Sequence, residues 1–462
     1  MKLLYIDLFC GAGGTSTGVE NARYGGRQCA KVIGCVNHDA NAIASHAANH
    51  PDAMHFTEDI RTLELSPLIA HIAKMRKLYP DAFVVLWASL ECTNFSKAKG
   101  GQPRDADSRT LAEHLFRYIE AINPDYIQIE NVEEFMSWGD LDENGKPISK
   151  DAGRLYQQWV ANVCGYGYRF AHRILNSADY GAYTSRRRFF GIFAKGSLPI
   201  AFPDPTHSKE GATGLFGRMQ RWKPVREVLD FTDEGKSIFG RKKPLVDATL
   251  ERIYAGLIKF VAGGKEAFLV KWNSMSQTGK YHAPSIDEPC PTVVTQNRLG
   301  IAQVNFLSKH YGGNPAGKCV SVNEPAGTIT TWDHHSFITA YYGNGTPGSI
   351  ETPAPTVTTN PKHQLVTCRM EQRESAIATT PDDSPAMAKI KRFMALYGII
   401  DIKMRMLRIP ELKRIMGFPS DYILVGTQAD QNKFIGNAVE VNMARVLCEA
   451  LCSQLINNNI VA

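Results

Sequence analysis

Short apolar runs alternate with helical patterns along the first 200 residues of the chain. Apolar runs that are typical of buried strands lie at residues 2–9, 31–37, 83–89, 125–131 and 187–194. Between them, apolar side chains recur at the spacing of a helix in residues 39–50 and 107–122. This alternation predicts an α/β fold, with a doubly wound and mostly parallel sheet covered by helices on both faces. Ligands of such folds bind at the carboxyl ends of the strands.

The pattern changes over residues 201–400, where glycine, proline, threonine and aromatic residues become frequent. The segments EPCPTVVTQN, EPAGTITTWD and TPAPTVTTNP repeat one motif and place a threonine at equivalent positions, Thr292, Thr328 and Thr356. Extended segments closed by Gly/Asn turns predict a smaller domain rich in β-structure and loops, although a duplicated strand–turn unit that only packs would leave the same pattern. Lysine, histidine, tyrosine and tryptophan are interleaved here, which suits contact with phosphates and bases.

After residue 400 the helical pattern returns. Apolar residues recur every four positions in the last helical stretch, at Val439, Met443, Leu447 and Leu451. Such a stripe predicts a buried helix face, which we expect beside the first strand. Residues 1–200 and 401–462 are therefore predicted to form one domain, into which residues 201–400 are inserted.

Composition narrows the class of protein. A chain of 462 residues is long enough for two domains, and its 44% hydrophobic residues allow a sizeable core. The net charge of +6 favours an anionic partner only mildly. Asp7 interrupts the apolar start and no run of about 18 apolar residues occurs, so neither a signal peptide nor a membrane span is expected. The ten cysteines lack a CxxC or zinc-finger spacing, which predicts reduced thiols in a cytoplasm and no metal site.

A glycine-rich turn follows the first apolar run. Gly11, Gly13 and Gly14 allow a tight turn there and let a ligand approach the backbone. Ser16 stands where the dinucleotide fingerprint has its last glycine, so the turn favours a nucleoside other than a nicotinamide cofactor. A turn that binds no ligand is the plainer alternative.

Reactive side chains lie at or near the ends of other predicted strands. Cys92 follows the run at 83–89, and Glu130 closes another strand. Arg186 and Arg188 alternate in an extended segment, so both can point into the same crevice. A surface acid and a solvated charge run are the alternative interpretations. Together, however, a thiolate can add to an electron-poor ring, an acid can hold a ring nitrogen protonated, and arginines can stabilise the developing charge.

In the order of its motifs, the chain resembles the DNA (cytosine-5) methyltransferase family. The segments that carry the resemblance are DLFCGAGGTSTG, SLECTNFS, DADSRTLAEHL, IENV, TSRRR, RMLRIPELKRIMGFP and IGNAVEVNMA. They cover about 260 residues on both sides of a variable stretch.

The resemblance implies a role for each matching residue. Cys92 would attack carbon 6 of a cytosine flipped out of duplex DNA, and Glu130 would bind ring nitrogen 3 and the exocyclic amine. Arg186 and Arg188 would hold the base and the loop geometry. Carbon 5 would then take a methyl group from S-adenosylmethionine, and loss of its proton would expel the cysteine.

The resemblance also implies a set of cofactor-binding residues: Phe9, Gly11, Gly13, Gly14, Asn37, Asp39, Asp59, Ile60, Leu111, Asn437 and Val439. The variable stretch would be a target-recognition domain that reads bases in the major groove. The expected partner is duplex DNA, bound by a monomer, and a cognate restriction enzyme in the same host is a further expected partner.

Three positions depart from the family pattern. Glu91 stands in place of the proline before the cysteine, and Thr184 in place of the glutamine that opens the arginine motif. Asn37 stands in place of the acid that usually binds the ribose hydroxyls, with Asp39 two residues later. Two alternatives therefore stay open, a transfer RNA cytosine methyltransferase and an inactive DNA-binding relative. The long variable stretch argues against the first, and the presence of all four catalytic residues, Cys92, Glu130, Arg186 and Arg188, argues against the second.

Overall fold

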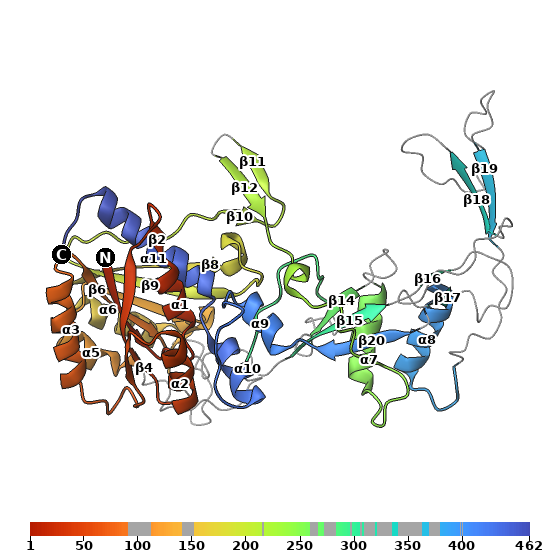
Figure 1. The fold of residues 1–462 in the computed structure, drawn as a ribbon, viewed down its shortest axis with the longest axis horizontal. Helices are drawn as coiled ribbons and strands as arrows, with labels where there is room; N and C mark the ends of the chain where they lie inside the picture. The colour runs from red at the N-terminus through yellow and green to blue at the C-terminus, as the bar shows by residue number, and fades with distance from the viewer. Residues whose placement is uncertain are drawn as a thin grey trace. The chain divides into compact units, whose positions relative to one another are not determined.

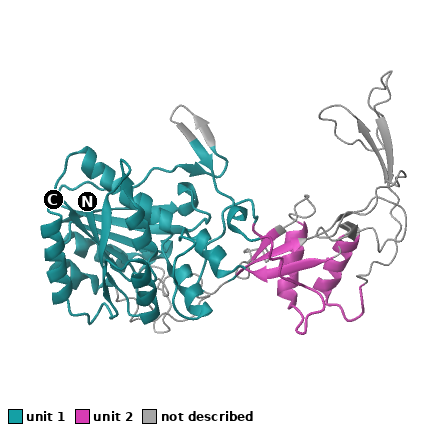
Figure 2. Ribbon diagram, in the orientation of Figure 1, with its two compact units in different colours: residues 1–230, 285–298, 407–462 teal, residues 231–284, 299–406 magenta. Residues whose placement is uncertain are grey.

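The computed structural model divides the chain into two compact units, shown in Figure 2. The first unit comprises residues 1–230, 285–298 and 407–462, and the second comprises residues 231–284 and 299–406. The described residues are 1–90, 112–140, 152–214, 217–258, 267–271, 283–295, 298–304, 307–308, 319–320, 335–340, 363–368, 379–397, 399 and 401–462. Of the candidate site residues, Cys92 and Leu111 lie outside the described residues, as does Glu91.

A seven-stranded sheet forms the centre of the first unit (Figure 1). Its strands, in spatial order, are β5 (Met54–Phe56), β4 (Ala30–Val36), β1 (Leu3–Leu8), β6 (Phe83–Ser89), β7 (Tyr126–Asn131), β9 (Arg187–Lys195) and β8 (Tyr168–Asn176). The first five are parallel, whereas β9 runs antiparallel to both of its neighbours. The mostly parallel sheet that the sequence predicts is confirmed.

Alternate residues of the central strands face opposite sides of the sheet, and both sides are buried. On one side, Leu4 and Ile6 of β1 pack with residues of α3 (Ser66–Leu78), α5 (Leu115–Ile122) and α6 (Arg154–Cys164). On the other side, Leu3 and Tyr5 pack with α1 (Gly14–Asn21) and α11 (Val441–Asn457). Burial on both faces explains why these strands appear in the sequence as continuous apolar runs.

Helix α11 lies against α1 at very short range. A Cβ atom added at Gly18 would lie 2.4 Å from the carbonyl oxygen of Val441 and 2.6 Å from Cβ of Ala444. Only glycine allows this approach, so α1 is held close to α11. The predicted apolar stripe is confirmed as buried, with Val439, Met443, Leu447 and Leu451 in the same core cluster as Leu3 and Tyr5.

The remaining elements of the first unit surround this sheet. They are β2 (Arg23–Tyr24), β3 (Arg27–Gln28), α2 (Ala40–Asn49), β10 (His207–Ser208), β11 (Ala212–Gly214), β12 (Gly217–Arg221), α9 (Ile409–Ile415), α10 (Gln428–Asn437) and the 3-10 helices Glu133–Ser137, Ser177–Tyr180 and Val225–Val228. No helix within the described parts of the chain has the length and apolar character needed to cross a lipid bilayer.

The second unit contains a four-stranded antiparallel sheet with its own core. The sheet strands are β13 (Lys236–Ser237), β20 (Ile402–Met406), β15 (Leu299–Val304) and β14 (Ala267–Lys271). Ile253 of α7 (Asp247–Gly256) and Ile390 of α8 (Pro385–Tyr397) pack with Phe268 of the sheet. Two further strand pairs are β16 (Leu307–Ser308) with β17 (Cys319–Val320), and β18 (His335–Ala340) with β19 (His363–Cys368). The sequence analysis did not predict α7 and α8.

Candidate active site

The glycine-rich turn after β1 has an unusual backbone. Phe9 has φ 60°, Gly11 has φ 51° and Gly13 has φ 102°, all in the left-handed region. A Cβ atom at Gly13 would also lie 2.4 Å from the hydroxyl oxygen of Tyr422, so this position is restricted to glycine twice over. Tyr422 donates a hydrogen bond to the carbonyl oxygen of Ala12 at 2.5 Å. The turn is therefore held by a residue near the other end of the chain.

The turn leads directly into α1. No side chain within the described residues caps the N-terminus of α1, where Gly13 is the N-cap residue. The N–H groups of a first helical turn have no partner within the helix, and they attract anionic groups. A Cβ atom at Gly14 would lie 2.5 Å from the carbonyl oxygen of Val439, which places Val439 beside the start of α1.

Asn37 and Asp39 follow β4, the next strand of the sheet. Asn37 Oδ1 accepts a hydrogen bond from the N–H of Asp39 at 2.9 Å. Asp39 caps α2 and forms an ion pair with Lys433 of α10 at 3.0 Å. Burial raises the pKa of Asp39, but its bonds to Lys433 and to the N–H of Ala42 outweigh burial and lower it. Asp39 is thus occupied in holding α2 and α10, and Asn37 is the polar side chain at the strand end.

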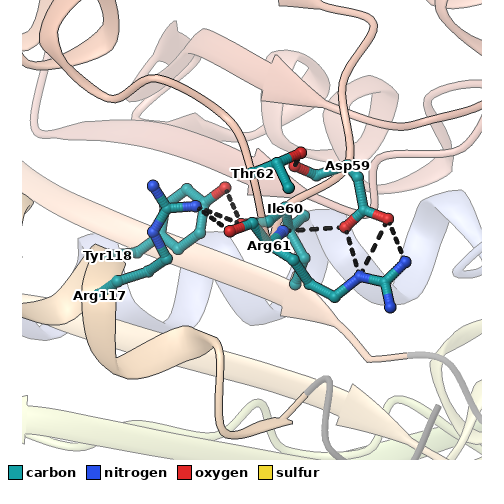
Figure 3. Close-up of polar contacts among 6 residues, drawn as sticks. All are labelled: Asp59, Ile60, Arg61, Thr62, Arg117 and Tyr118. Atoms are coloured by element: carbon teal, nitrogen blue, oxygen red, sulfur yellow. Dashed lines mark hydrogen bonds and ion pairs between the residues drawn. The ribbon is translucent and has the colours of Figure 1, made fainter. Parts of the chain in front are cut away.

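Asp59 and Ile60 lie in a turn after β5 that α5 holds in place (Figure 3). The carbonyl oxygen of Ile60 accepts hydrogen bonds from Arg117 at 3.0 Å and from the hydroxyl of Tyr118 at 2.9 Å. Asp59 accepts from the N–H of Arg61 at 2.9 Å and forms an ion pair with its guanidinium at 2.6 Å. The hydrogen bond with this guanidinium lowers the pKa of Asp59 to about 2.

Glu130, Arg186 and Arg188 meet at the carboxyl end of β7. Nε of Arg188 lies 3.3 Å from Glu130 Oε1, and Nη2 of Arg186 lies 3.8 Å from the same oxygen. Glu130 is 5% exposed and Arg186 is 4% exposed, so this ion pair is almost completely removed from water. The structure therefore brings together three of the four residues for which the sequence predicts a catalytic role.

The described part of β6 places the chain that leads to Cys92 beside Glu130. Ser89, the last residue of β6, pairs with Glu130 in the parallel ladder of β6 and β7. Asn131 donates a hydrogen bond from Nδ2 to the carbonyl oxygen of Leu90 at 3.4 Å. The chain therefore continues towards Cys92 from a point next to the acid, although Cys92 itself lies outside the described residues.

Residues 288–293 form a support for Arg186 that the sequence analysis did not predict. The N–H of Cys290 bonds to the carbonyl oxygen of Tyr183 at 2.5 Å, and the N–H of Ser185 bonds to the carbonyl oxygen of Cys290 at 2.8 Å. Thr184, one of the departures from the family pattern, is fully buried in this contact. The first copy of the threonine repeat therefore lies in the first unit, beside the arginine motif.

Two backbone carbonyl groups accept hydrogen bonds from Arg186. Nη1 of Arg186 donates to the carbonyl oxygen of Gly436 at 3.2 Å and to that of Val293 at 3.5 Å. A Cβ atom at Gly436 would lie 2.3 Å from the backbone of Val294, so the end of α10 and residues 293–295 are in close contact. Asn437 is the last residue of α10 and is exposed. No sequence signal pointed to these carbonyl groups, because their contact depends on segments far apart in the chain.

A family model for C-5 cytosine-specific DNA methylases matches residues 3–453 of the chain. The chain belongs to this family. The resemblance found from the sequence motifs is thereby confirmed.

Individual relatives within the family are distant. The chain is 28% identical to the Type II methyltransferase M.AgeI of Thalassovita gelatinovora over 211 residues, which cover 46% of the chain and 44% of the relative. It is 21% identical to M.SacI of Streptomyces achromogenes, over 98% of the chain and 94% of the relative. The chain spans about half the length of several curated relatives, such as 52% of M1.HphI of Haemophilus parahaemolyticus. A solved prophage-encoded putative DNA modification methyltransferase from E. coli is 17% identical, with a TM-score of 0.45, over 98% of this chain and 100% of that one.

Proposed function

We propose that this protein is a DNA (cytosine-5) methyltransferase that transfers a methyl group from S-adenosylmethionine to a cytosine in a specific duplex sequence. One observation carries the proposal. The buried carboxylate of Glu130 contacts Arg188 and Arg186 at the end of β7, directly beside the strand end from which the chain leads to Cys92. An acid fixed in this way can bind one edge of a pyrimidine while a thiolate from the next loop approaches its ring.

The chemistry assigned to the residues is nucleophilic catalysis. The sulfur of Cys92 forms a bond to carbon 6, and the electron pair of the carbon 5–carbon 6 double bond becomes available at carbon 5. Glu130 passes a proton to ring nitrogen 3 and so stabilises the charge that the addition creates. After carbon 5 has been methylated, it loses its proton to a base, the double bond re-forms and the bond to sulfur breaks.

The residues at the carboxyl ends of the strands fit S-adenosylmethionine, which supplies an electrophilic methyl group when bound. The uncapped N-terminus of α1, after Gly11, Gly13 and Gly14, suits the carboxylate of its amino acid part. Asn37 would bind the ribose hydroxyls through Nδ2, because Oδ1 already accepts from Asp39. The remaining residues that we assign to the cofactor site are Phe9, Asp39, Asp59, Ile60, Leu111, Asn437 and Val439.

We assign sequence recognition to the inserted residues, chiefly to the threonine-repeat segments around Thr328 and Thr356, which lie outside the described residues. Alternating lysine, histidine and aromatic residues in these segments suit contact with phosphates and base edges. We further infer a monomer that acts in the cytoplasm. Its relatives are Type II methyltransferases, so a cognate restriction enzyme in the same host is the partner that we propose.

A mechanism-based trap tests the proposal. Duplex DNA with 5-fluorocytosine at the target should form a covalent complex with the protein, because no proton can leave carbon 5. The complex should be absent with Cys92→Ser and unchanged with Cys164→Ser, which removes a half-buried thiol elsewhere in the first unit. A trap that forms equally well with Cys92→Ser would refute the assignment. Labelled methyl transfer into transfer RNA but not into duplex DNA would instead establish the RNA enzyme.

A further inference from the structure

Three neighbouring strands place a row of polar side chains under α2. Asp7 of β1 pairs with Cys35 of β4, and Cys35 pairs with His55 of β5. Residues that pair directly across parallel strands have side chains on the same face of the sheet. Cys10 comes two residues after the end of β1, and its sulfur lies close to possible ligand atoms of Cys35 and of His46 of α2. His55 lies beside His46.

The distances within this group are those of a metal site. Nδ1 of His46 lies 3.6 Å from Sγ of Cys35 and 3.0 Å from Nε2 of His55. Sγ of Cys10, Sγ of Cys35 and a ring nitrogen of His46 all lie within 4.8 Å of one another. Tetrahedral zinc with the usual bond lengths would separate two nitrogens by about 3.3 Å and a sulfur from a nitrogen by about 3.6 Å. All three residues are buried.

The protonation of His46 leaves a lone pair directed at Cys35 and His55. Ser16 donates a hydrogen bond from Oγ to Oδ2 of Asp7 at 2.8 Å, so the ring nitrogen Nε2 of His46, 2.9 Å from Oγ, must donate to it. Nδ1 then carries the lone pair, and both Cys35 and His55 compete for it. A serine and a carboxylate that bond the far nitrogen in this way are the arrangement that orients a metal-bound imidazole.

The remaining groups are consistent with a cation at this position. Oδ1 of Asp7 is buried and has no hydrogen-bond partner among the described residues.

We propose that Cys10, Cys35, His46 and His55 bind one zinc ion as a closed, four-coordinate structural site. The two thiols would release their protons to solvent on binding, and both imidazoles would bind as neutral ligands. The inference does not depend on the proposed methyl transfer. It replaces the expectation of no metal site, which rested on spacing in the sequence alone.

The site would fix the glycine-rich turn from beneath. The N–H of Gly13 bonds to the carbonyl oxygen of Cys10 at 3.0 Å, and a Cβ atom at Gly13 would lie 3.2 Å from the ring of His46. Zinc would therefore tie the turn covalently to β4, β5 and α2. Its loss should loosen the turn while leaving the core beneath α11 intact.

A second buried cluster supplies the internal control. Cys29, Cys448 and Cys452 also lie within 4.8 Å of one another, but they offer three sulfurs and no imidazole. The full chain, purified without chelators, should contain one zinc per molecule by mass spectrometry of the metal. Cobalt in place of zinc should give the visible spectrum of a tetrahedral site with two thiolates and two imidazoles.

Variants locate the ion. Cys35→Ser and His55→Asn should lose the zinc, whereas Cys448→Ser should retain it. Because His55 is only half-buried, His55→Asn should keep the circular dichroism spectrum of the parent protein. Ser16→Ala should lower zinc affinity about 10–100-fold, since it removes the partner of a ligand rather than a ligand. Protein that takes up no zinc, zinc that is lost from Cys448→Ser but kept by Cys35→Ser, or a Cys10–Cys35 disulfide in the intact mass would each overturn the proposal.

Discussion

Nε of Arg188 lies 3.3 Å from Oε1 of Glu130, across the antiparallel pair of β9 and β7. Arg186, the residue just before β9, places its Nη2 atom 3.8 Å from the same oxygen. The acid at the end of a parallel strand is thus positioned by the antiparallel strand next to it. The mixed character of the sheet is therefore what brings the two arginines to the carboxyl end of β7.

Glu130→Gln should lower the rate of methyl transfer by at least about 100-fold, because glutamine keeps the shape of the acid but cannot pass a proton to the base. The rate of transfer from labelled S-adenosylmethionine to duplex DNA measures the effect. Binding of the cofactor, measured by calorimetry, should change less than about twofold, since Glu130 would contact the base and not the donor. A variant that transfers methyl groups at the parent rate would exclude Glu130 from the chemistry.

Arg186 and Arg187 are neighbours that should differ strongly on substitution. Arg186 is buried against Glu130 and two backbone carbonyl groups, so Arg186→Ala removes one of the two cationic partners of a buried acid and the hydrogen bonds to both carbonyl groups. The free energy of unfolding should fall by about 3–5 kcal/mol. Arg187 is 61% exposed and pairs with Glu133 at the surface, so Arg187→Ala should cost no more than about 1 kcal/mol. Urea denaturation of both variants provides the comparison, and equal losses would contradict the assignment of Arg186 as a buried anchor.

Five strands of the central sheet follow from the sequence, because their residues are buried on both faces and form continuous apolar runs. Strands β5 and β8, at the two edges of the sheet, do not: β5 has three half-buried residues, and β8 mixes buried, half-buried and exposed residues. In the second unit, α8 carries Ile390, Phe393 and Met394 at helical spacing, but it follows a long stretch of turns that obscured it.

The candidate site could likewise be predicted only in part from the sequence. The meeting of Glu130 with the arginines follows from strand ends that share one edge of a sheet. The role of Asp39 as a cap that also pairs with Lys433 depends on α10, which comes almost 400 residues later in the chain. The cluster of Cys10, Cys35, His46 and His55 follows no ligand spacing, because strand pairing and not local sequence brings its members together.

Glu440 should make stability depend on pH. It caps α11 by accepting hydrogen bonds from the N–H groups of Asn442 and Met443, yet complete burial raises its pKa to about 7. The pKa in the unfolded chain is about 4.3, so between these values the folded chain binds more protons than the unfolded chain. The contribution of Glu440 is fully present below the unfolded pKa and is lost as pH rises through 7. The full contribution of Glu440 to the free energy of unfolding would be about 4 kcal/mol.

The melting temperature should accordingly fall between pH 5.5 and pH 8.5, and Glu440→Gln should reduce this difference, because glutamine does not titrate. Glu449→Gln is the matched control on the same helix, since Glu449 forms a partly exposed pair with Arg445 at 2.7 Å. An unchanged pH dependence in Glu440→Gln would show that Glu440 is ionised in the folded protein throughout this range.

Exchange of the inserted residues with those of a relative should move the methylated sequence, provided that residues 285–298 stay in place. This short segment belongs to the first unit, where it binds Arg186 through Val293 and packs against Gly436. A chimera that replaces residues 231–284 and 299–406 separately should therefore keep its methyl transfer and acquire the specificity of the donor. A chimera that replaces residues 231–406 as one piece should lose stability, because the new segment must fit closely against Gly436, where an added Cβ would lie only 2.3 Å from the backbone of Val294.

Sequencing of methylated positions in DNA from cells that express each chimera gives the specificity, and thermal melting gives the stability. An active first chimera that still methylates the original sequence would show that the first unit, and not the inserted residues, reads the DNA.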